Sequence, residues 1–357
     1  MPVKRDALYL LTGFKPRPFQ ALRIPSLLVP PETKNHGFFV ISLAKFCRWL
    51  GEKAAQAGVQ IFAGFSAVEL LIEGERVAGV RTSDMGVGKD GRRKSNYQAG
   101  VEIRAKVTVF GEGPKGTLSE KLIDRFHLRE EKDRPMYSLG VKEVIELPDN
   151  RFEGRVLHTL GYPLSPSEFG GGFLYGMKGP FVSAGLVVGI DWTDPRMDPQ
   201  LELQRWKSHP FLHGLLRGGK VVEYGSRMIP EGGHFSIPKL YAPGALLVGD
   251  AAGLVNIPRL KGIHLAMKSG MLAAETILEA LKKNDFSEKR LSDYPTKVEQ
   301  SFIKKELYRS RNFRQAFQSG LFPGLIRSQL HRLLGGRGIA PQLRFEEPLK
   351  RLTPARI

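Results

Sequence analysis

The clearest hydrophobic pattern in the chain lies between residues 245 and 281. Apolar residues 245–248 run into Gly249 and Asp250, which predicts a buried strand that ends in a tight loop. From Gly262 onward, apolar and small residues recur at helical spacing, which predicts a long helix with one closely packing face. The members of this face are Ile263, Ala266, Met267, Gly270, Ala273, Ala274, Ile277, Leu278 and Leu281.

Shorter patterns predict the elements on either side of this stretch. A helix is expected over residues 42–57, ended by Gly58, and a second one over residues 117–126. Apolar runs that predict strands are found at residues 59–62, 66–72, 76–82 and 101–110. Residues 136–237 are expected to form an antiparallel sheet, because turns separate successive strand-like runs. These runs are residues 138–147, 156–160, 172–177, 181–191 and 220–224.

The two ends of the chain differ in pattern. Prolines rule out a continuous helix over residues 1–35 and predict an extended segment on the surface. They are Pro16, Pro18, Pro25, Pro30 and Pro31. Residues 285–314 are charged and mostly helical in pattern, and residues 321–334 predict a basic amphipathic helix. Such a helix suits an anionic membrane interface, and the alternative is a helix packed on the core.

Composition narrows the class of protein. At 357 residues and 41% hydrophobic residues, the chain can bury one large core or two domains, which excludes a disordered or fibrous protein. The single cysteine, Cys47, excludes a disulfide within the chain and a four-cysteine metal or iron-sulfur site built by this chain alone. Cys47 shares an apolar helical face with Leu43, Phe46 and Leu50, so it is expected to be buried and inert. The scattered histidines lack metal-ligand spacing and no nucleophile elbow appears, so we predict neither a metal site nor a catalytic side chain.

The charge suggests anionic partners. The formal net charge is +18, from 54 Lys+Arg against 36 Asp+Glu, so the surface should attract nucleic acid, anionic lipid or an acidic protein. Zinc-finger spacing, RNP-like aromatics and a helix-turn-helix pattern are missing, so nucleic acid is not expected. No apolar run reaches the roughly 18 residues of a membrane-spanning helix, and the start lacks the pattern of a secretory signal. The default is a cytosolic protein, with a membrane surface as a candidate partner.

Asp250 is the first candidate for a ligand-binding residue. A lone carboxylate beside glycines at the end of a strand can accept hydrogen bonds from the hydroxyls of a sugar or ribityl chain. The start of the following helix, at Gly262 and Ile263, offers free N–H groups and a partial positive charge to a phosphate or an anionic flavin ring. This arrangement favours a redox cofactor. On spacing alone, an ordinary turn with a capping aspartate remains equally open.

A second glycine motif is a weaker candidate. Gly111, Gly113 and Gly116 spell GxGxxG after a predicted strand and before a helix. Pro114 stiffens this turn, the following helix is short, and no clean apolar strand precedes the acidic pair near residue 130. The pattern therefore argues against a dinucleotide site of the usual kind.

The segments GDAAGLVNIP and KGIHLAMKSGMLAAE resemble the second flavin-contacting motif of the electron transfer flavoprotein-ubiquinone oxidoreductases and, more loosely, of the geranylgeranyl reductases. Other segments are similar to the quinone oxidoreductases, in the same order along the chain. They are NHGFFVISLAKFCRWL, VAGVRTSDMGVGKDG, KVTVFGEGPKGTLSEKL, FGGGFLYGM, GLVVGIDW, GGKVVEYGSRMIPEGG and FSIPKL. Most are weak alone, but their common order over nearly the whole chain is specific, and the geranylgeranyl reductases share only the flavin-contacting ones.

The resemblance implies an α/β (α+β) fold of the glutathione-reductase type, an FAD-binding fold with an inserted antiparallel β-sheet domain and a C-terminal helical region. Residues 1–135 would be a partial FAD-binding domain and residues 136–240 the quinone or substrate domain. Residues 241–290 would be the second part of the FAD-binding domain, and residues 291–357 a basic region at the membrane surface. Compared with the family, the N-terminal GxGxxG unit and the C-terminal ferredoxin-like domain are missing from the sequence, so we expect an N-terminally incomplete fold.

The resemblance also implies FAD as cofactor, which would carry the chemistry. The residues that it places against the flavin are Glu112, Gly113, Gly249, Asp250, Gly262 and Ile263. It places Gly170 and Gly171 against the quinone, where a bulge in a strand is the alternative interpretation of the glycine run.

The implied activity is electron transfer from reduced electron transfer flavoprotein, through FAD, to ubiquinone. An iron-sulfur cluster would come from a separate ferredoxin-like subunit, and we hypothesise that the cations of the loop at residues 84–100 dock the electron donor. The implied location is peripheral, on the cytoplasmic face of a bacterial inner membrane or on the mitochondrial inner membrane. Two alternatives stay open: a geranylgeranyl-reductase-like enzyme that reduces isoprenoid double bonds, and a non-catalytic fragment that holds no flavin.

Overall fold

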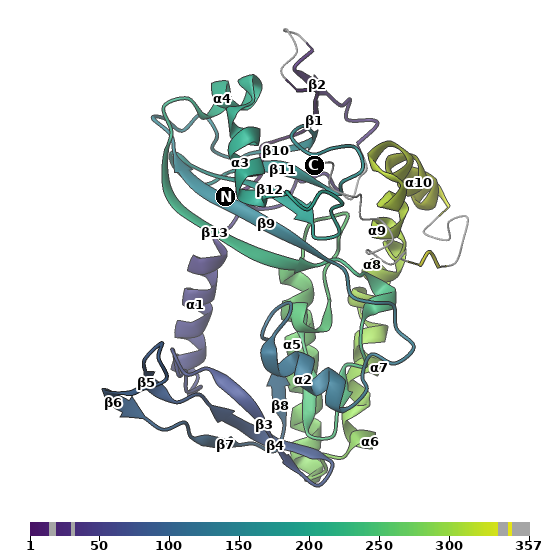
Figure 1. The fold of residues 1–357 in the computed structure, drawn as a ribbon. Helices are drawn as coiled ribbons and strands as arrows, with labels where there is room; N and C mark the ends of the chain where they lie inside the picture. Colours follow the sequence, from purple (N-terminus) through teal and green to yellow (C-terminus); the bar gives the residue numbers. More distant parts are fainter. Residues whose placement is uncertain (14–18, 30–32, 335–341, 345–357) are drawn as a thin grey trace.

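Helix α5 (Ile263–Lys283) runs through a lower lobe, and a seven-stranded sheet forms an upper lobe above it (Figure 1). The computed structural model describes residues 1–13, 19–29, 33–334 and 342–344. Two separate clusters of buried apolar side chains stabilise the two lobes. The pattern of residues 245–281, which predicts strand, loop and helix, is confirmed.

The upper sheet has the strand order β13-β9-β12-β11-β10-β1-β2. Its strands are β1 (Arg5–Leu11), β2 (Ala21–Arg23), β9 (Tyr137–Glu146), β10 (Arg155–Gly161), β11 (Gly170–Gly176), β12 (Phe181–Gly189) and β13 (Lys220–Pro230). All neighbours are antiparallel except β1 and β10, which run parallel. The antiparallel sheet expected for residues 136–237 is therefore confirmed.

The prediction of an extended surface segment over residues 1–35 is wrong for residues 5–11, which form strand β1 of the upper sheet. It lies inside the sheet between β10 and β2, and Leu11 at its end is buried. The prolines begin only at Pro16, after the strand has ended. Because β1 pairs with a strand far away in the chain, its parallel partner leaves no local trace in the sequence.

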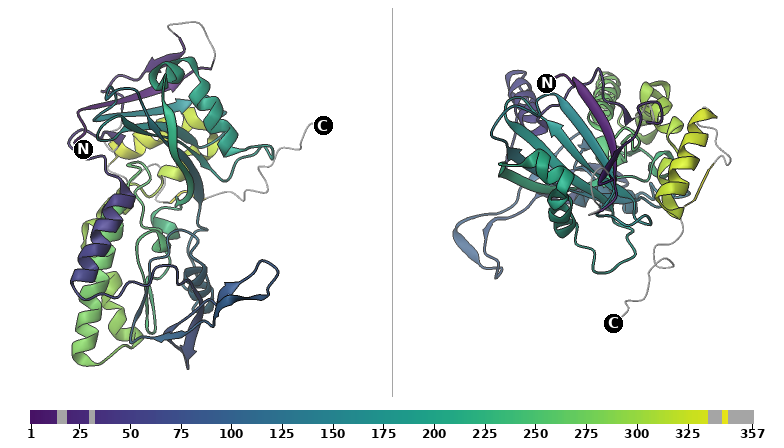
Figure 2. Two further views of the ribbon diagram at one scale, coloured as in Figure 1. Left: turned by 90° about the vertical axis from the view of Figure 1, so that its left-hand side faces the viewer. Right: turned by 90° about the horizontal axis from the view of Figure 1, so that it is seen from above.

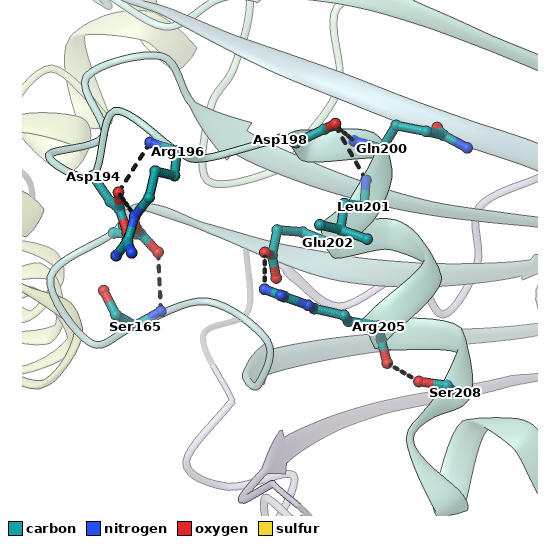
Figure 3. Close-up of polar contacts among 10 residues, drawn as sticks. Ser165, Asp194, Arg196, Asp198, Gln200, Leu201, Glu202, Arg205 and Ser208 are labelled. Carbon is teal, nitrogen blue, oxygen red and sulfur yellow. Dashed lines mark hydrogen bonds and ion pairs between the residues drawn. The ribbon is translucent and has the colours of Figure 1, made fainter. Parts of the chain in front are cut away.

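Helices α3 (Pro199–Ser208) and α4 (Pro210–Leu216) cover one face of this sheet (Figure 1). The Asp198 carboxylate caps α3, because it accepts hydrogen bonds from the N–H groups of residues 200 and 201 at 2.9 and 3.2 Å (Figure 3). Trp206 of α3 is fully buried and donates its indole N–H to the Thr159 hydroxyl at 2.8 Å. This contact fixes α3 against β10.

The lower lobe is built around a short parallel pair of strands. Strand β8 (Thr108–Phe110) runs parallel to β15 (Ala245–Leu247), which also pairs with β14 (Tyr241–Ala242). Helix α2 (Thr117–Arg125) follows β8, and α5 follows β15. The carboxyl ends of β8 and β15 therefore lie side by side, where two loops enter their helices.

A second, antiparallel sheet closes the bottom of the lower lobe. Its strands are β3 (Ala67–Glu73), β4 (Arg76–Thr82) and β7 (Glu102–Arg104), which agrees with two predicted strands and divides the run at 101–110 between β7 and β8. The hairpin of β5 (Met85–Val87) and β6 (Arg93–Gln98) projects away from the body of the protein (Figure 2). Its exposed position agrees with the predicted basic loop.

Two predictions are wrong for helix α1 (Leu43–Gln56) and the residues that follow it. The Ser42 hydroxyl caps it by accepting a hydrogen bond from the Lys45 N–H, but none of its side chains is buried by the described residues. Cys47 is accordingly exposed rather than buried. Residues 59–62 form no strand, because no neighbouring strand within the described chain offers them backbone partners.

The C-terminal part is helical, as predicted. Its helices are α6 (Glu288–Leu291), α7 (Asp293–Gln300), α8 (Phe302–Arg309), α9 (Phe313–Ala316) and α10 (Leu321–Leu333). Among the residues that the structure describes, no helix is long and apolar enough to cross a membrane. The predicted stripe on residues 321–334 falls on α10 and one residue beyond it.

Replacing Gly172 with alanine should destabilise the upper lobe. The added Cβ atom would lie 2.3 Å from Cε2 of the buried Trp206 ring, which cannot move without disturbing α3. We expect the free energy of unfolding, measured by urea denaturation, to fall by about 1–3 kcal/mol. The control is Gly225→Ala on β13, where nothing lies within 4 Å of the new atom. An equal loss in both variants would contradict the predicted packing.

Candidate functional site

The two glycine loops singled out in the sequence meet at one edge of the lower lobe. The loop after β8 contains Gly111 and Gly113, and the loop after β15 contains Gly249 and Asp250. The Val248 N–H donates to the Phe110 carbonyl at 3.0 Å, which ties the loops together where they begin. The meeting of these loops follows from the parallel pairing of β8 and β15.

Asp250 lies at the start of α5. A Cβ atom added at Gly262 would be 3.4 Å from the Asp250 Oδ1 atom. The Asp250 side chain makes no hydrogen bond within the described part of the chain, and burial raises the pKa of its carboxyl. Asp250 is partly buried, and a carboxylate that has lost part of its hydration gains from a hydrogen bond, so a hydroxyl-bearing ligand that donates to it would stabilise the site.

The first turn of α5 is open to an acceptor. No side chain of the described residues caps Gly262, and the first turn, which begins at Ile263, contains no acidic residue. The N–H groups of a helix start therefore remain available beside Asp250. Together they suit a ligand that carries both hydroxyl groups and an electron-rich ring or phosphate, as a flavin nucleotide does.

Glu112 has a structural partner. Its carboxylate accepts hydrogen bonds from the Leu118 N–H at 3.3 Å, the Ser119 N–H at 2.6 Å and the Ser119 hydroxyl at 2.7 Å. The side chain thus caps α2, a role that the sequence motif does not reveal. Gly113 has a φ of +81°, and no atom lies within 4 Å of its added Cβ, so its backbone faces open space. The predicted flavin contacts of both residues remain predictions.

A cavity of about 350 Å³ lies under the upper sheet. Its volume falls in the range of small-molecule sites, and its lining is mostly apolar. The walls come from β1 and β10, from the start of β11 with Gly170 and Gly171, from residues 257–260 and from α10. The cavity therefore brings together segments from both ends and the middle of the chain.

Gly170 and Gly171 belong to regular strand and not to a bulge. Residues 170–176 pair with residues 188–182 of β12 without a shift in register, which excludes the alternative interpretation. A Cβ atom at Gly170 would lie 2.2 Å from the Val187 carbonyl oxygen, and one at Gly171 would lie 2.5 Å from that of Thr159. The glycines are therefore required by sheet packing, and they leave bare backbone in the cavity wall.

Several polar groups in or beside the cavity were missed by the sequence analysis. The His158 imidazole hydrogen-bonds the Tyr175 hydroxyl at 2.8 Å, and burial lowers the pKa of His158 to about 4, so the ring is neutral at pH 7. Asp6 accepts hydrogen bonds from Asn35, whose side-chain oxygen accepts one from Lys261 at 2.9 Å. No spacing in the sequence connects these residues, because they come from β1, β10, β11 and two loops.

The structure brings Asp250 together with Gly262 at the start of α5, and it places Gly170 and Gly171 in the wall of the cavity. Residues 257–260 line the cavity and lead directly into the start of α5. Within the described residues, no three His, Cys, Asp or Glu side chains gather to hold a metal ion. The arrangement suits an electron-carrying ligand next to an apolar acceptor.

Comparison with known proteins gives matches over most of the chain. Residues 137–229 match the family model described as ETF-QO, ubiquinone-binding. The chain is 43% identical over 342 residues to the mitochondrial electron transfer flavoprotein-ubiquinone oxidoreductase of Arabidopsis thaliana, and the match covers 94% of this chain and 52% of the plant protein. It is 40% identical over 344 residues to the probable electron transfer flavoprotein-ubiquinone oxidoreductase of Acinetobacter baylyi, with coverages of 91% and 60%. The chain thus spans little more than half the length of each relative.

Solved structures are similar at lower identity. A geranylgeranyl bacteriochlorophyll reductase-like protein of Thermoplasma acidophilum has a TM-score of 0.65 at 20% identity, covering 98% of this chain and 79% of that one. The halogenase PltM, in a complex with FAD, has a TM-score of 0.52 at 12% identity, with coverages of 88% and 58%. At these identities the likeness shows the fold alone, a mixed α/β fold shared with flavin-dependent reductases and halogenases.

Proposed function

The chain is a relative of the electron transfer flavoprotein-ubiquinone oxidoreductases over nearly its whole length, and we propose that it passes electrons through FAD to ubiquinone at a membrane surface. The observation that carries this proposal is the segment of residues 257–262. It lines the apolar cavity at one end and begins α5 beside Asp250 at the other. A cofactor at the start of α5 and an acceptor in the cavity would therefore share one short wall.

In this proposal the lower lobe holds the flavin half of FAD, in a glutathione-reductase-type arrangement. Asp250 would accept hydrogen bonds from the ribityl chain, and the N–H groups at Gly262 and Ile263 would stabilise negative charge on the ring. Gly249 lets the backbone approach closely, since its φ of +58° is one that other residues rarely adopt. When bound, FAD supplies the one- and two-electron chemistry that the amino acids lack.

The cavity is the proposed quinone site. A flat quinone ring can lie against the bare backbone at Gly170 and Gly171, and the apolar residues suit its methoxy and isoprenoid groups. The same cavity is bounded by Leu321 and Leu325 of α10. An isoprenoid tail that leaves along α10 would pass these apolar side chains on its way to the protein surface.

The surface around α10 is the proposed membrane contact. Leu321 and Leu325 line the cavity from one face of α10, while Phe322 and Ile326, with exposed fractions of 56% and 63%, point outward. Residues 19–29 repeat this division: Ile24 lines the cavity, whereas Leu27 and Leu28 are exposed. An apolar rim around a cavity mouth, on a protein of net charge +18, fits peripheral binding to an anionic membrane.

The β5–β6 hairpin is the proposed contact for the electron donor. Its tip carries Lys89, Arg92, Arg93 and Lys94, which are exposed. Such a cluster on a projecting hairpin attracts an acidic partner and speeds its encounter. The donor in this proposal is reduced electron transfer flavoprotein, with an iron-sulfur cluster supplied by a separate ferredoxin-like subunit.

The first test measures cofactor and quinone together. The purified chain, incubated with FAD, should show a bound-flavin absorption spectrum, and a ubiquinone analogue should reoxidise it after reduction with dithionite. Asp250→Ala should weaken FAD binding about 10-fold or more, because a hydrogen bond to a charged group is lost. Asp194→Ala is the control, since this aspartate pairs with Arg196 at the surface of the upper lobe (Figure 3). A colourless protein that does not take up FAD would refute the proposal.

The membrane contact is tested with two exposed residues of α10. Replacing Phe322 and Ile326 with serine should lower binding to anionic liposomes, measured by cosedimentation, by about 10-fold or more, because each buried side chain contributes about 1.5–3 kcal/mol. Leu278→Ser is the control: it removes an equally exposed apolar side chain, 58% exposed, from α5 of the lower lobe. Unchanged binding by the α10 variant would place the membrane contact elsewhere.

The donor contact is tested by charge reversal. Replacing Lys89, Arg92 and Arg93 with glutamate should slow electron transfer from reduced electron transfer flavoprotein by about 10-fold or more at low salt, and the difference should shrink as salt is added. Stopped-flow absorption of the flavin measures the rate. The control reverses the exposed Lys282, Lys283 and Lys289, which changes the net charge equally at a distance from the hairpin. Equal slowing by both variants would show a general charge effect and no docking at the hairpin.

A further inference from the structure

Glu231 is a buried acid in the wall of the proposed quinone cavity. It follows β13 directly, and its N–H donates to the Met136 carbonyl at 2.7 Å, which fixes the backbone at the end of the sheet. Only 1% of the residue is exposed to solvent, and it nevertheless lines the cavity. A carboxyl in such a place needs a functional or structural reason, because burying it is costly.

Arg314 and Ser138 hold one oxygen of this carboxyl. The Ser138 hydroxyl donates to the Glu231 Oε2 atom, and the Arg314 Nε atom lies 3.4 Å from the same oxygen. Arg314 is itself buried, and its other end pairs with Asp191 at Nη2. Two buried carboxyls thus share one guanidinium, so the charge on Glu231 is only partly compensated.

The second oxygen is left free. The Glu231 Oε1 atom makes no hydrogen bond within the described part of the chain, although the residue is almost fully buried. Burial raises the pKa of the Glu231 carboxyl, Asp191 raises it further, and Arg314 and Ser138 oppose the rise. Because Oε2 accepts the Ser138 hydrogen bond and faces Arg314, a proton on the carboxyl belongs on Oε1.

The cluster contacts the residue that precedes the two glycines of the cavity wall. The Arg314 guanidinium stacks on the Phe169 ring at 4.0 Å from its centroid, and Phe169 precedes Gly170 in the chain. Phe169, Gly170 and Glu231 all line the same cavity. A ring that rests against the glycines is therefore next to the wall that contains the acid.

From this geometry we infer that Glu231 is the proton donor to the quinone, a role that rests on the proposed function of the cavity. Ubiquinone takes up two electrons from the electron donor and two protons to become ubiquinol. The O–H bond of the Glu231 carboxyl breaks as an O–H bond forms at one quinone oxygen. Water supplies the proton for the other oxygen, and it restores the Glu231 carboxyl only after ubiquinol has left the cavity. Arg314 and Ser138 stabilise the carboxylate in the interval.

Two other polar groups of the cavity, His158 and Asp6, suit this role less well. His158 is neutral with a pKa of about 4, and its Nε2 atom is engaged with the Tyr175 hydroxyl. Both Asp6 oxygens face donors on Asn35. Glu231 alone among these three combines a raised pKa with an oxygen that no described residue occupies.

The test is infrared difference spectroscopy of bound ubiquinone-1, reduced electrochemically in the full chain without relying on flavin. Reduction should remove the C=O stretch of a protonated carboxyl, and E231Q, which keeps the shape of the side chain, should bind ubiquinone-1 but lack this change. E143Q is the control, because Glu143 is a buried carboxyl paired with Lys207 outside the cavity. In protein loaded with FAD, E231Q should slow ubiquinone reduction by about 10²–10⁴-fold.

A second variant keeps the inference testable if E231Q does not fold. Ser138→Ala removes a hydrogen bond that favours the ionised form, so the carboxyl change should persist and the pH at which the carboxyl ionises should rise. A carboxyl change that survives in E231Q, or an ionisation pH unmoved in S138A, would overturn the assignment while leaving the quinone site standing. Failure of the unchanged protein to bind ubiquinone-1 would overturn the quinone site and this role together.

Discussion

The hydrogen-bonded loop of residues 254–262 is the constraint on which both proposed sites depend. Its backbone is closed by hydrogen bonds from the Leu254 N–H to the Gly249 carbonyl at 3.1 Å and between Asn256 and Lys261 in both directions at 3.0 and 3.2 Å. Leu260 adopts a φ of +53°, an uncommon value that such a closed loop can hold in place. Because the loop is closed on itself, the cavity wall and the start of α5 keep a fixed relation.

The glycines of β11 show how far packing alone explains a residue type. Gly170 faces the Val187 carbonyl, Gly171 faces that of Thr159, and Gly172 faces the Trp206 ring, each so closely that a Cβ atom would overlap. The sheet therefore requires all three glycines before any ligand is considered. What supports a binding role for two of them is the cavity on their open side, which the sequence does not show.

The sequence predicts those parts of the fold whose pattern is local. The strand, loop and helix around Asp250, the two strands at residues 66–82 and the antiparallel sheet all follow from periodicity and turn residues within short windows. Strand β1 was missed because its parallel partner, β10, is distant in the chain. The predicted strand at residues 59–62 was wrong because its apolar run has no neighbouring strand among the residues that the structure describes. The prediction that Cys47 is buried was wrong for the same reason: an apolar helical face is buried only where another element covers it.

The residues of the candidate site also fall into two groups, those that a local sequence pattern predicts and those that only the fold brings together. Asp250 and Gly262 could be found because both lie in the short segment between strand β15 and helix α5, and the hydrophobic pattern predicts these two elements. Glu231, Ser138 and Arg314 come from the end of β13, from β9 and from α9, and no spacing relates them. A buried acid shared between distant elements is visible only once the chain is folded, and its chemistry depends on how little of its charge the neighbours compensate. The resemblance of the sequence to a family therefore indicates the proposed electron path, whereas the proposed proton donor is visible only in the packing.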